Sequence, residues 1–457
     1  MDAKLPAVSL AEQLAGRIAA LRADALPAGV RAKCEDLLID VAGLCATARN
    51  EDYVKAVLAG LDDDGPCTAI GHTRTLSSAG AALVNGTAAH GEDFDDTFEG
   101  GPVHAGAVIV PAVLAVCERH GRGGPDALLG IAVGCEVMCR LSTVVPKAVH
   151  KAGFHPTAIF GAMGAAVGVG AALGLPQKQI VDALGIAGSM ASGIIEYLAE
   201  GTWTKRMHPG WAAQSGLRAA LLARGGFLGP RTVFEGVHGL FHGFAHTTKG
   251  DFDALIGDFA ERWVIETLAF KPYPCGTMAH PYIDCAKRLA ARGIKPIDVK
   301  ELVCEVAEGT VHRLWEPLAV KQQPPNCYAA KFATPFILAT GFVKGGVGLD
   351  AFTESAVNDP DVLALAAKVR YVIDPDNPYP NGFTGHIRAV LNDGRVVEER
   401  QPHFRGGANE PLTRADIEEK FTLSARHGGW DAARSAAALK LLATLYQGPI
   451  DLKSLRG

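Results

Sequence analysis

Aromatic side chains are scarce in this chain of 457 residues, and an excess of positive charge is absent. Phe, Trp and Tyr together make up only 7% of the chain, whereas Ala and Gly are abundant. Small residues suit closely packed helices, while a β-sandwich depends on β-branched and aromatic side chains. The formal net charge is −5, which argues against a nucleic-acid partner. The composition therefore predicts a helical protein that does not bind nucleic acid.

Closely paired cysteines are also missing. The ten cysteines are scattered along the chain, and no CxxC motif occurs among them. Cys135 and Cys139 lie one helical turn apart within an apolar run, which predicts buried, reduced thiols and a cytoplasmic location. The same scattering excludes the clustered thiolates that hold an iron–sulfur cluster.

The sequence predicts neither a secretory leader nor a membrane partner. The first 27 residues form an amphipathic helical pattern, without the basic segment and apolar core of a signal peptide. The longest apolar stretch, 158–176, is about long enough to raise the question of a membrane span. About half of it is Gly and Ala, and a polar segment precedes it directly. We therefore expect a buried helix of small residues.

The pattern of apolar residues divides the chain into regions of different secondary structure. Helical spacing dominates from residue 8 to about 247. The segment WVIETLAFKPYPCG, which begins at residue 263, has strand character, and 299–309 alternates like a strand. Residues 386–400 contain an Asn-Asp-Gly turn, which predicts a hairpin. We predict a mainly α protein with a large all-helical domain and a smaller α+β lid domain. The predicted helical domain spans 1–264 and is completed by 409–457, and the lid domain spans 265–408.

The segment HGEDFDDTFEGGPVHAG, residues 90–106, crowds carboxylates, glycines and histidines into one loop. A calcium loop starting at Asp93 would need Gly at its sixth position and Glu at its twelfth, where this chain has Phe98 and His104. The Asp-x-Asp-Asp pattern also occurs in some terpene cyclases, but these enzymes need an aromatic-walled cavity to stabilise carbocations. Five Trp and eight Tyr in the chain disfavour that reading. A solvated loop and a general acid/base site remain.

Histidine and cationic side chains gather at predicted helix entries. KAGFHPTAIFG places His155 at a helix start, where backbone N–H groups and the helix dipole favour an anion. EGTWTKRMHPGWAAQSG supplies Lys205, Arg206 and His208 ahead of a helix that we expect at 210–226.

A third segment, AFKPYPCGTMAHPYIDCA, adds Lys271 and His280 around two prolines. A lone His before Pro is most often a capping residue, and a Lys-Arg pair is most often a solvated face. Three such motifs in a mildly acidic chain nevertheless predict a pocket for a small polycarboxylate.

Six segments occur in a fixed order: NGTAAHGEDFDDT, HPTAIFG, GTWTKRMHPGWAAQSG, FEGVHGLF, KPYPC, and the KF that follows NEPLTRADIEE. In order and spacing they resemble the signatures of the MmgE/PrpD family, which includes 2-methylcitrate dehydratase, cis-aconitate decarboxylase and iminodisuccinate epimerase. The resemblance runs from the first helix to about residue 430. It implies a helical domain with a smaller α+β lid, a homodimer, and chemistry without a metal or organic cofactor.

The resemblance also implies the site residues. Positions that match the family motifs are Asp93, Thr97, His104, His155, Lys205 and Lys271. We expect Asp93, His104, His155 and Lys205 to be catalytic, with His155 and Asp93 as the base/acid pair and Lys205 neutralising charge. Lys271 is expected to clamp a substrate carboxylate and Thr97 to position the substrate. Further candidates for substrate binding are Arg206, His208, His280 and His312. The remaining acids Asp95, Asp96 and Glu99 should orient the loop, cap helices or face water.

The predicted activity is that of a cofactor-independent lyase, a hydro-lyase acting on a small di- or tricarboxylic acid such as a 2-methylcitrate-like substrate. The alternatives are an isomerase or epimerase, a decarboxylase on a related acid, a non-catalytic dimeric binding protein and a metal-dependent hydrolase.

Two departures bear on the substrate. In the decarboxylase branch a His follows the lid lysine by five residues, where this chain has Gly276, and a Tyr lies in a lid segment where this chain has no Tyr between 283 and 327. Both differences count against cis-aconitate decarboxylase without selecting 2-methylcitrate dehydratase.

Overall fold

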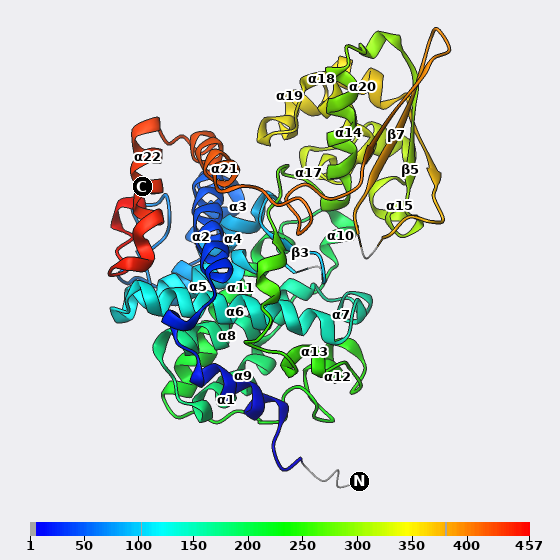
Figure 1. The fold of residues 1–457 in the computed structure, drawn as a ribbon. Helices are drawn as coiled ribbons and strands as arrows, with labels where there is room; N and C mark the ends of the chain where they lie inside the picture. Colours follow the sequence, from blue (N-terminus) through cyan, green and yellow to red (C-terminus); the bar gives the residue numbers. More distant parts are fainter. Residues whose placement is uncertain (1–5, 102, 380–381) are drawn as a thin grey trace. The chain divides into compact units, whose positions relative to one another are not determined.

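The computed structural model describes residues 6–101, 103–379 and 382–457. The described part of the chain is mainly helical, as the composition predicts, and carries one four-stranded sheet and two sheets of two short strands each (Figure 1). It folds into two compact units, each described below by itself. Unit 1 comprises the chain up to Gly91, Asp95–Leu268 and Thr413–Gly457, and unit 2 comprises Glu92–Phe94 and Ala269–Leu412.

Unit 1 is built around five helices that pack on one another: α4 (Ser78–Gly91), α5 (Gly106–His120), α6 (Gly124–Val144), α8 (Pro156–Leu173) and α11 (Thr204–Arg224). The surrounding elements are α1 (Leu10–Ala20), α2 (Ala28–Ala48), α3 (Asp52–Ala59), α7 (Ala148–Lys151), α9 (Gln177–Met190), α10 (Tyr197–Glu200), α12 (Leu240–Ala245), α13 (Asp253–Ile256), α21 (Arg414–His427), α22 (Ala432–Thr444), β1 (Cys67–Thr68), β2 (Thr75–Leu76) and β3 (Thr97–Phe98).

Small residues let helices α6 and α8 approach closely. A Cβ atom at Gly164 would lie 2.7 Å from the carbonyl oxygen of Gly134, and one at Gly168 would lie 2.7 Å from that of Gly130. Both helices are long and apolar enough to cross a membrane, but 89% and 94% of their most apolar windows are buried within the protein. The predicted buried helix of small residues is thus confirmed.

Local sequence signals set several helix starts in unit 1. The Ser77 hydroxyl accepts a hydrogen bond from the Gly80 N–H at 3.0 Å, and His155 is the residue directly before α8. The prediction for 210–226 was wrong at its start, because α11 begins at Thr204 and continues through Pro209. A proline removes one backbone donor but does not always end a helix. Lys205, Arg206 and His208 therefore lie on the first turns of a helix.

The C-terminal segment packs on α2 in unit 1. The Lys420 ammonium of α21 lies 2.7 Å from the Asp40 carboxylate of α2, and the Thr47 hydroxyl donates to the Ser424 carbonyl at 2.9 Å. Asp40 and Lys420 are both buried. Burial raises the pKa of Asp40, while the Lys420 charge lowers it.

Unit 2 contains a four-stranded sheet in the order β6-β5-β7-β8. Strand β5 (Val299–Val306) pairs parallel with β6 (Val369–Ile373) and antiparallel with β7 (Gly385–Leu391), which pairs antiparallel with β8 (Val396–Gln401). Helix α14 (His280–Ala291) packs against β7, β8 and helix α18 (Thr334–Lys344). The other helices are α15 (Glu308–Leu314), α16 (Leu318–Gln322), α17 (Cys327–Ala330), α19 (Glu354–Val357) and α20 (Pro360–Ala366).

The structure separates correct from incorrect strand predictions. The strand within 299–309 and the hairpin within 386–400 are confirmed. The strand expected in WVIETLAFKPYPCG is wrong except for the two residues of β4 (Leu268–Ala269), because a 3₁₀ turn occupies Val264–Thr267. Pro272 and Pro274, which lack the N–H that a strand must donate, prevent extension beyond it. All ten cysteines are free thiols, and nine of them are buried, as predicted.

Candidate active site

Unit 1 gathers histidines and a lysine from four places in the chain. His90 ends helix α4, His104 precedes α5, His155 precedes α8, and Lys205 and His208 lie on α11. His90, His155 and His208 are buried, and 12% of the His104 side chain is exposed. Of the predicted site residues, His104, His155, Lys205 and His208 are thus brought together by the fold.

A buried carboxylate, an imidazole and an ammonium group form a chain of contacts. Oδ2 of Asp95 lies 2.7 Å from Nδ1 of His90, and Nζ of Lys205 lies 3.1 Å from Nε2 of the same ring. An ammonium nitrogen only donates, so Nε2 of His90 accepts from Lys205 and Nδ1 donates to Asp95. The Asp95 carboxylate therefore holds His90 as a neutral ring whose lone pair faces the Lys205 ammonium.

The neighbouring acid Asp96 caps a helix. Its carboxylate accepts hydrogen bonds from the backbone N–H groups of Ala105 and Gly106, both at 2.9 Å. Burial, with the adjacent Asp95 charge, raises the pKa of Asp96 to about 7. Nδ1 of His104 lies 2.7 Å from the Asp96 carbonyl oxygen, to which it donates. The expectation that these acids orient the loop or cap a helix holds for Asp95 and Asp96, whereas the alternative that they face water is wrong for both.

His155 and His208 form a pair of rings. Their Nδ1 atoms lie 3.1 Å apart, so one nitrogen donates and the other accepts. Burial lowers the pKa of both rings, and the Lys205 charge lowers both further; the pKa of His208 falls to about 4. Both rings are therefore neutral near pH 7. A neutral imidazole in a buried site has the proton state that a general base needs.

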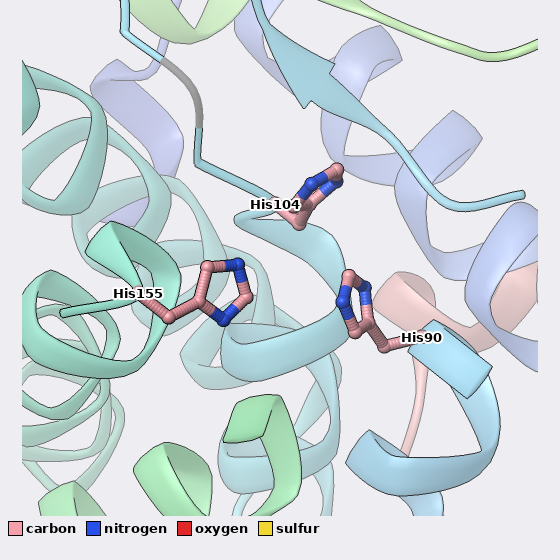
Figure 2. A group of neighbouring side chains, drawn as sticks. All are labelled: His90, His104 and His155. Atoms are coloured by element: carbon pink, nitrogen blue, oxygen red, sulfur yellow. The ribbon is translucent and has the colours of Figure 1, made fainter. Parts of the chain in front are cut away.

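Figure 2 shows His90, His104 and His155 as close neighbours. Their ring centroids are 4.8 Å apart for His90 and His104, 5.8 Å for His90 and His155, and 6.4 Å for His104 and His155. Together with Lys205 they supply proton acceptors and one fixed positive charge in a mostly buried space. Such an arrangement can bind a carboxylate and move a proton next to it.

A hollow of about 450 Å³ adjoins this cluster within unit 1. His208 and Tyr197 line it and are buried, while Glu196, Glu200 and Trp211 of its lining are exposed. The Tyr197 ring also contacts the rings of His155 and His208, at centroid distances of 6.2 and 5.7 Å. His208 is thus shared by the hollow and the histidine cluster.

The loop residue Asp93 belongs to unit 2, where it contacts a buried lysine. Nζ of Lys271 lies 3.2 Å from the Asp93 carboxylate and donates to the Asp93 carbonyl at 2.9 Å. Asp93 has a φ of +57°, in the left-handed region that Asp tolerates better than most residues. Nζ of Lys331 similarly lies 3.0 Å from the Glu92 carboxylate. Lys271, the expected substrate clamp, thus contacts the loop through its ammonium group, and its binding of a substrate carboxylate stays a prediction.

The remaining predicted residues are spread over both units. Thr97 lies buried on β3, and the Arg206 guanidinium stacks on the Tyr53 ring at 4.3 Å. The buried His280 contacts the Cys275 carbonyl oxygen through Nε2 at 3.2 Å and packs on the rings of Tyr273 and Phe404. His312 is exposed on α15.

Sequence reasoning missed two residues of the cluster, His90 and Asp95. The acidic loop contains His90, for which its motif predicts no function, and Asp95, for which it predicts only a supporting one. Their separation of five residues follows the end of a helix, where no regular period predicts which side chains meet. The available signal was a histidine at a helix C-terminus followed by several acids, which is weak by itself.

A helical unit that gathers three buried histidines and a partly buried one around a lysine has the features of an enzyme that binds anions and transfers protons. Comparison with known proteins gives the family. The MmgE/PrpD N-terminal domain matches residues 12–253, and the MmgE/PrpD C-terminal domain matches residues 273–443. The chain belongs to the MmgE/PrpD family, as its motifs predicted.

Several relatives share most of the chain. The cis-aconitate decarboxylase of Homo sapiens is 31% identical over 81% of this chain and 79% of its own. The cis-aconitate decarboxylase of Aspergillus terreus is 27% identical over 88% of this chain and 86% of its own. A cis-aconitate decarboxylase-like protein of Aspergillus oryzae is 26% identical over 91% of this chain and 90% of its own.

Proposed function

We propose that this protein is a lyase acting on a small tricarboxylic acid, with cis-aconitate as the first substrate to test. The observation that carries the proposal is the Lys205 ammonium beside His90, His104 and His155 in one mostly buried cluster. A tricarboxylate needs positive charge and proton-transfer groups in such a space. The names of the relatives support cis-aconitate as the substrate. We also propose that the protein acts as a homodimer without a metal or organic cofactor.

Decarboxylation of cis-aconitate needs one charge-stabilising group and one proton donor. The bond from the CH₂ carbon to its carboxylate breaks, CO₂ leaves, and the electron pair of that bond moves into a new terminal double bond. The original double bond takes up a proton at its CH carbon, which gives methylenesuccinate. Lys205 is placed to neutralise charge that develops beside a carboxylate, and a ring of the histidine cluster to deliver the proton.

A hydro-lyase is the second candidate. The decarboxylase branch has a histidine five residues after the lysine of the lid, and this chain has Gly276 at that position of unit 2. Gly276 has Leu314 and Phe332 as its neighbours, and the nearby His280 ring is buried against Tyr273 and Phe404. A hydro-lyase would instead remove or add water across a carbon–carbon bond of a related acid, with a histidine taking the proton next to the carboxylate.

The test is product analysis by ¹H NMR with purified protein and cis-aconitate, citrate and 2-methylcitrate. Methylenesuccinate from cis-aconitate establishes decarboxylation, whereas interconversion of a hydroxy acid and its alkene establishes hydro-lyase activity. In D₂O, an isomerase would exchange a C–H proton of the substrate for deuterium without loss of CO₂ or water. That result would contradict both the decarboxylase and the hydro-lyase assignment.

The first prediction concerns Lys205 and His155. Lys205→Ala and His155→Ala should each lower kcat/KM by at least about a hundredfold, the usual loss when charge stabilisation or acid/base catalysis is removed. Steady-state kinetics on the substrate identified above measures the effect. The matched controls are Lys178→Ala, an exposed lysine of α9, and His120→Ala, an exposed histidine of α5. Near wild-type turnover in both site variants would contradict the assignment.

A further inference from the structure

The three rings of Figure 2 are each held through the same nitrogen. Nδ1 of His90 donates to the Asp95 carboxylate, Nδ1 of His104 to the Asp96 carbonyl, and Nδ1 of His155 contacts Nδ1 of His208. The nitrogen that each ring can offer to a ligand at their centre is therefore Nε2. One ring nitrogen from each of the three lies within 4.8 Å of those of the other two.

This arrangement has the chemistry of a zinc site with an open position. Zn²⁺ is bound by neutral imidazole nitrogens, and three histidines with a fourth, exchangeable ligand are a recurring set. Ligating histidines typically donate their other N–H to a carboxylate or a backbone carbonyl, which fixes the ring. His90 and His104 have these two partners. The partners of His90 and His104 thus match those of zinc ligands, and the three ring nitrogens must move closer together to lie about 2.0 Å from one ion.

We infer that Zn²⁺ binds to Nε2 of His90, His104 and His155 and thereby inhibits the protein. The ion and the Lys205 ammonium compete for one atom, because Nζ of Lys205 lies 3.1 Å from Nε2 of His90. Bound zinc displaces Lys205 and occupies the space between the rings. Zinc is therefore an inhibitor and not a cofactor. The inhibition rests on the proposed function, whereas the binding of zinc does not.

Isothermal titration with ZnCl₂ in a non-chelating buffer tests the site on the whole protein. The wild type should bind one ion per chain at the cluster, and His104→Ala should weaken that binding by about tenfold or more, as expected for a lost imidazole ligand. Lys205→Met should tighten it by about tenfold or more, since it removes a like charge from the site. Tighter zinc binding in a variant that has lost turnover is a result that a purely catalytic lysine does not predict.

The matched controls are histidines outside the cluster. His238 and His242 are exposed and lie near each other, at a centroid distance of 6.1 Å, so they are the alternative zinc site on the surface of unit 1. His238→Ala/His242→Ala should leave the titration of the cluster unchanged. Wild-type affinity in His104→Ala, or loss of binding in the double surface variant, would overturn the inference.

Inhibition is measured separately. Turnover should fall with the same midpoint as zinc binding and return when a chelator is added. If no substrate is found, the proposed function fails while the titrations still decide the zinc site. If turnover is found but zinc binds with equal affinity to wild type and Lys205→Met, the inference fails and the proposed function stands.

Discussion

At the scale of residues, the contacts of His90 define how the lysine of the site is held. Asp95 is completely buried and contacts Nδ1 of His90, and Lys205 contacts Nε2. The negative charge of Asp95 on one side of the His90 ring and the positive charge of Lys205 on the other orient the dipole of the imidazole. Asp95 is thus a positioning residue that acts on Lys205 through His90.

The prediction at this scale concerns Asp95→Asn. The variant keeps the size of the side chain but removes the charge, so kcat should fall by about tenfold or more as Lys205 loses its fixed position. In a Lys205→Ala background the same substitution should cost little further activity, because residues that act through one group are not additive.

A double-mutant cycle of kcat and KM measures this coupling. Asp182→Asn, which changes an acid on α9 that pairs with an exposed lysine, is the control and should leave activity unchanged. Full additivity of Asp95→Asn and Lys205→Ala would show that Asp95 does not act through Lys205.

The sequence could predict some residues of the cluster and not others for a physical reason. His104, His155, Lys205 and His208 occur in short motifs of histidines and cations at or near predicted helix entries, so their grouping could be inferred. His90 and Asp95 meet only because the chain turns after Gly91, and the turn geometry is set by contacts distant in sequence. The contact of Lys271 with Asp93 joins residues 178 positions apart and could not be read from either motif.

At the scale of elements, the packing of α21 on α2 depends on one buried ion pair, Lys420 with Asp40. Lys420→Met leaves the Asp40 charge buried without that partner, so the free energy of unfolding should fall by about 3–5 kcal/mol. Chemical denaturation followed by circular dichroism measures the change.

Replacing both members with apolar residues should recover most of this loss, because a well-packed apolar pair can substitute for a buried ion pair. Lys55→Met, in an exposed pair with Asp52 on α3, is the control and should change stability little. An equal effect of Lys55→Met and Lys420→Met would contradict the importance of burial.

Element boundaries show where sequence patterns were insufficient. A continuous apolar run identified α8, which is buried on nearly all sides, and alternation of apolar residues identified β5. Apolar periodicity placed the start of α11 six residues late, since the helical turn before Pro209 is polar and has no apolar stripe. It also predicted a long strand at β4, where the tertiary environment favours a 3₁₀ turn.

At the scale of the whole molecule, the C-terminal 45 residues are integral to unit 1. A chain that ends at Leu412 lacks α21 and α22, exposes apolar surface of α2 and leaves Asp40 without Lys420. We expect this variant to lose the cooperative unfolding transition, as judged by thermal denaturation, and to aggregate.

The control for this truncation is a chain that ends at Gly448, which keeps both helices. It should retain the cooperative transition. A cooperative transition near the wild-type temperature in the shorter chain would show that unit 1 folds without its C-terminal segment.

The composition was sufficient to predict a mainly helical protein, because Ala and Gly content and helical periodicity extend over most of the chain, and the sheet was predicted from the alternation at 299–309 and the turn within 386–400. It could not predict that three residues of the acidic loop, Glu92–Phe94, belong to unit 2. That assignment depends on contacts with Lys271 and Lys331, which the local pattern of the loop does not contain.

The assignment of Glu92–Phe94 to unit 2 limits how this unit can be transferred to another protein by recombination. A gene segment that encodes 269–412 would carry Lys271 and Lys331 into a new host without Glu92 and Asp93. Both lysines are almost completely buried, and a buried ammonium without its carboxylate is costly. Unit 2 is therefore built from two separate stretches of sequence, and a functional chimera that receives 269–412 needs a host with carboxylates at both loop positions.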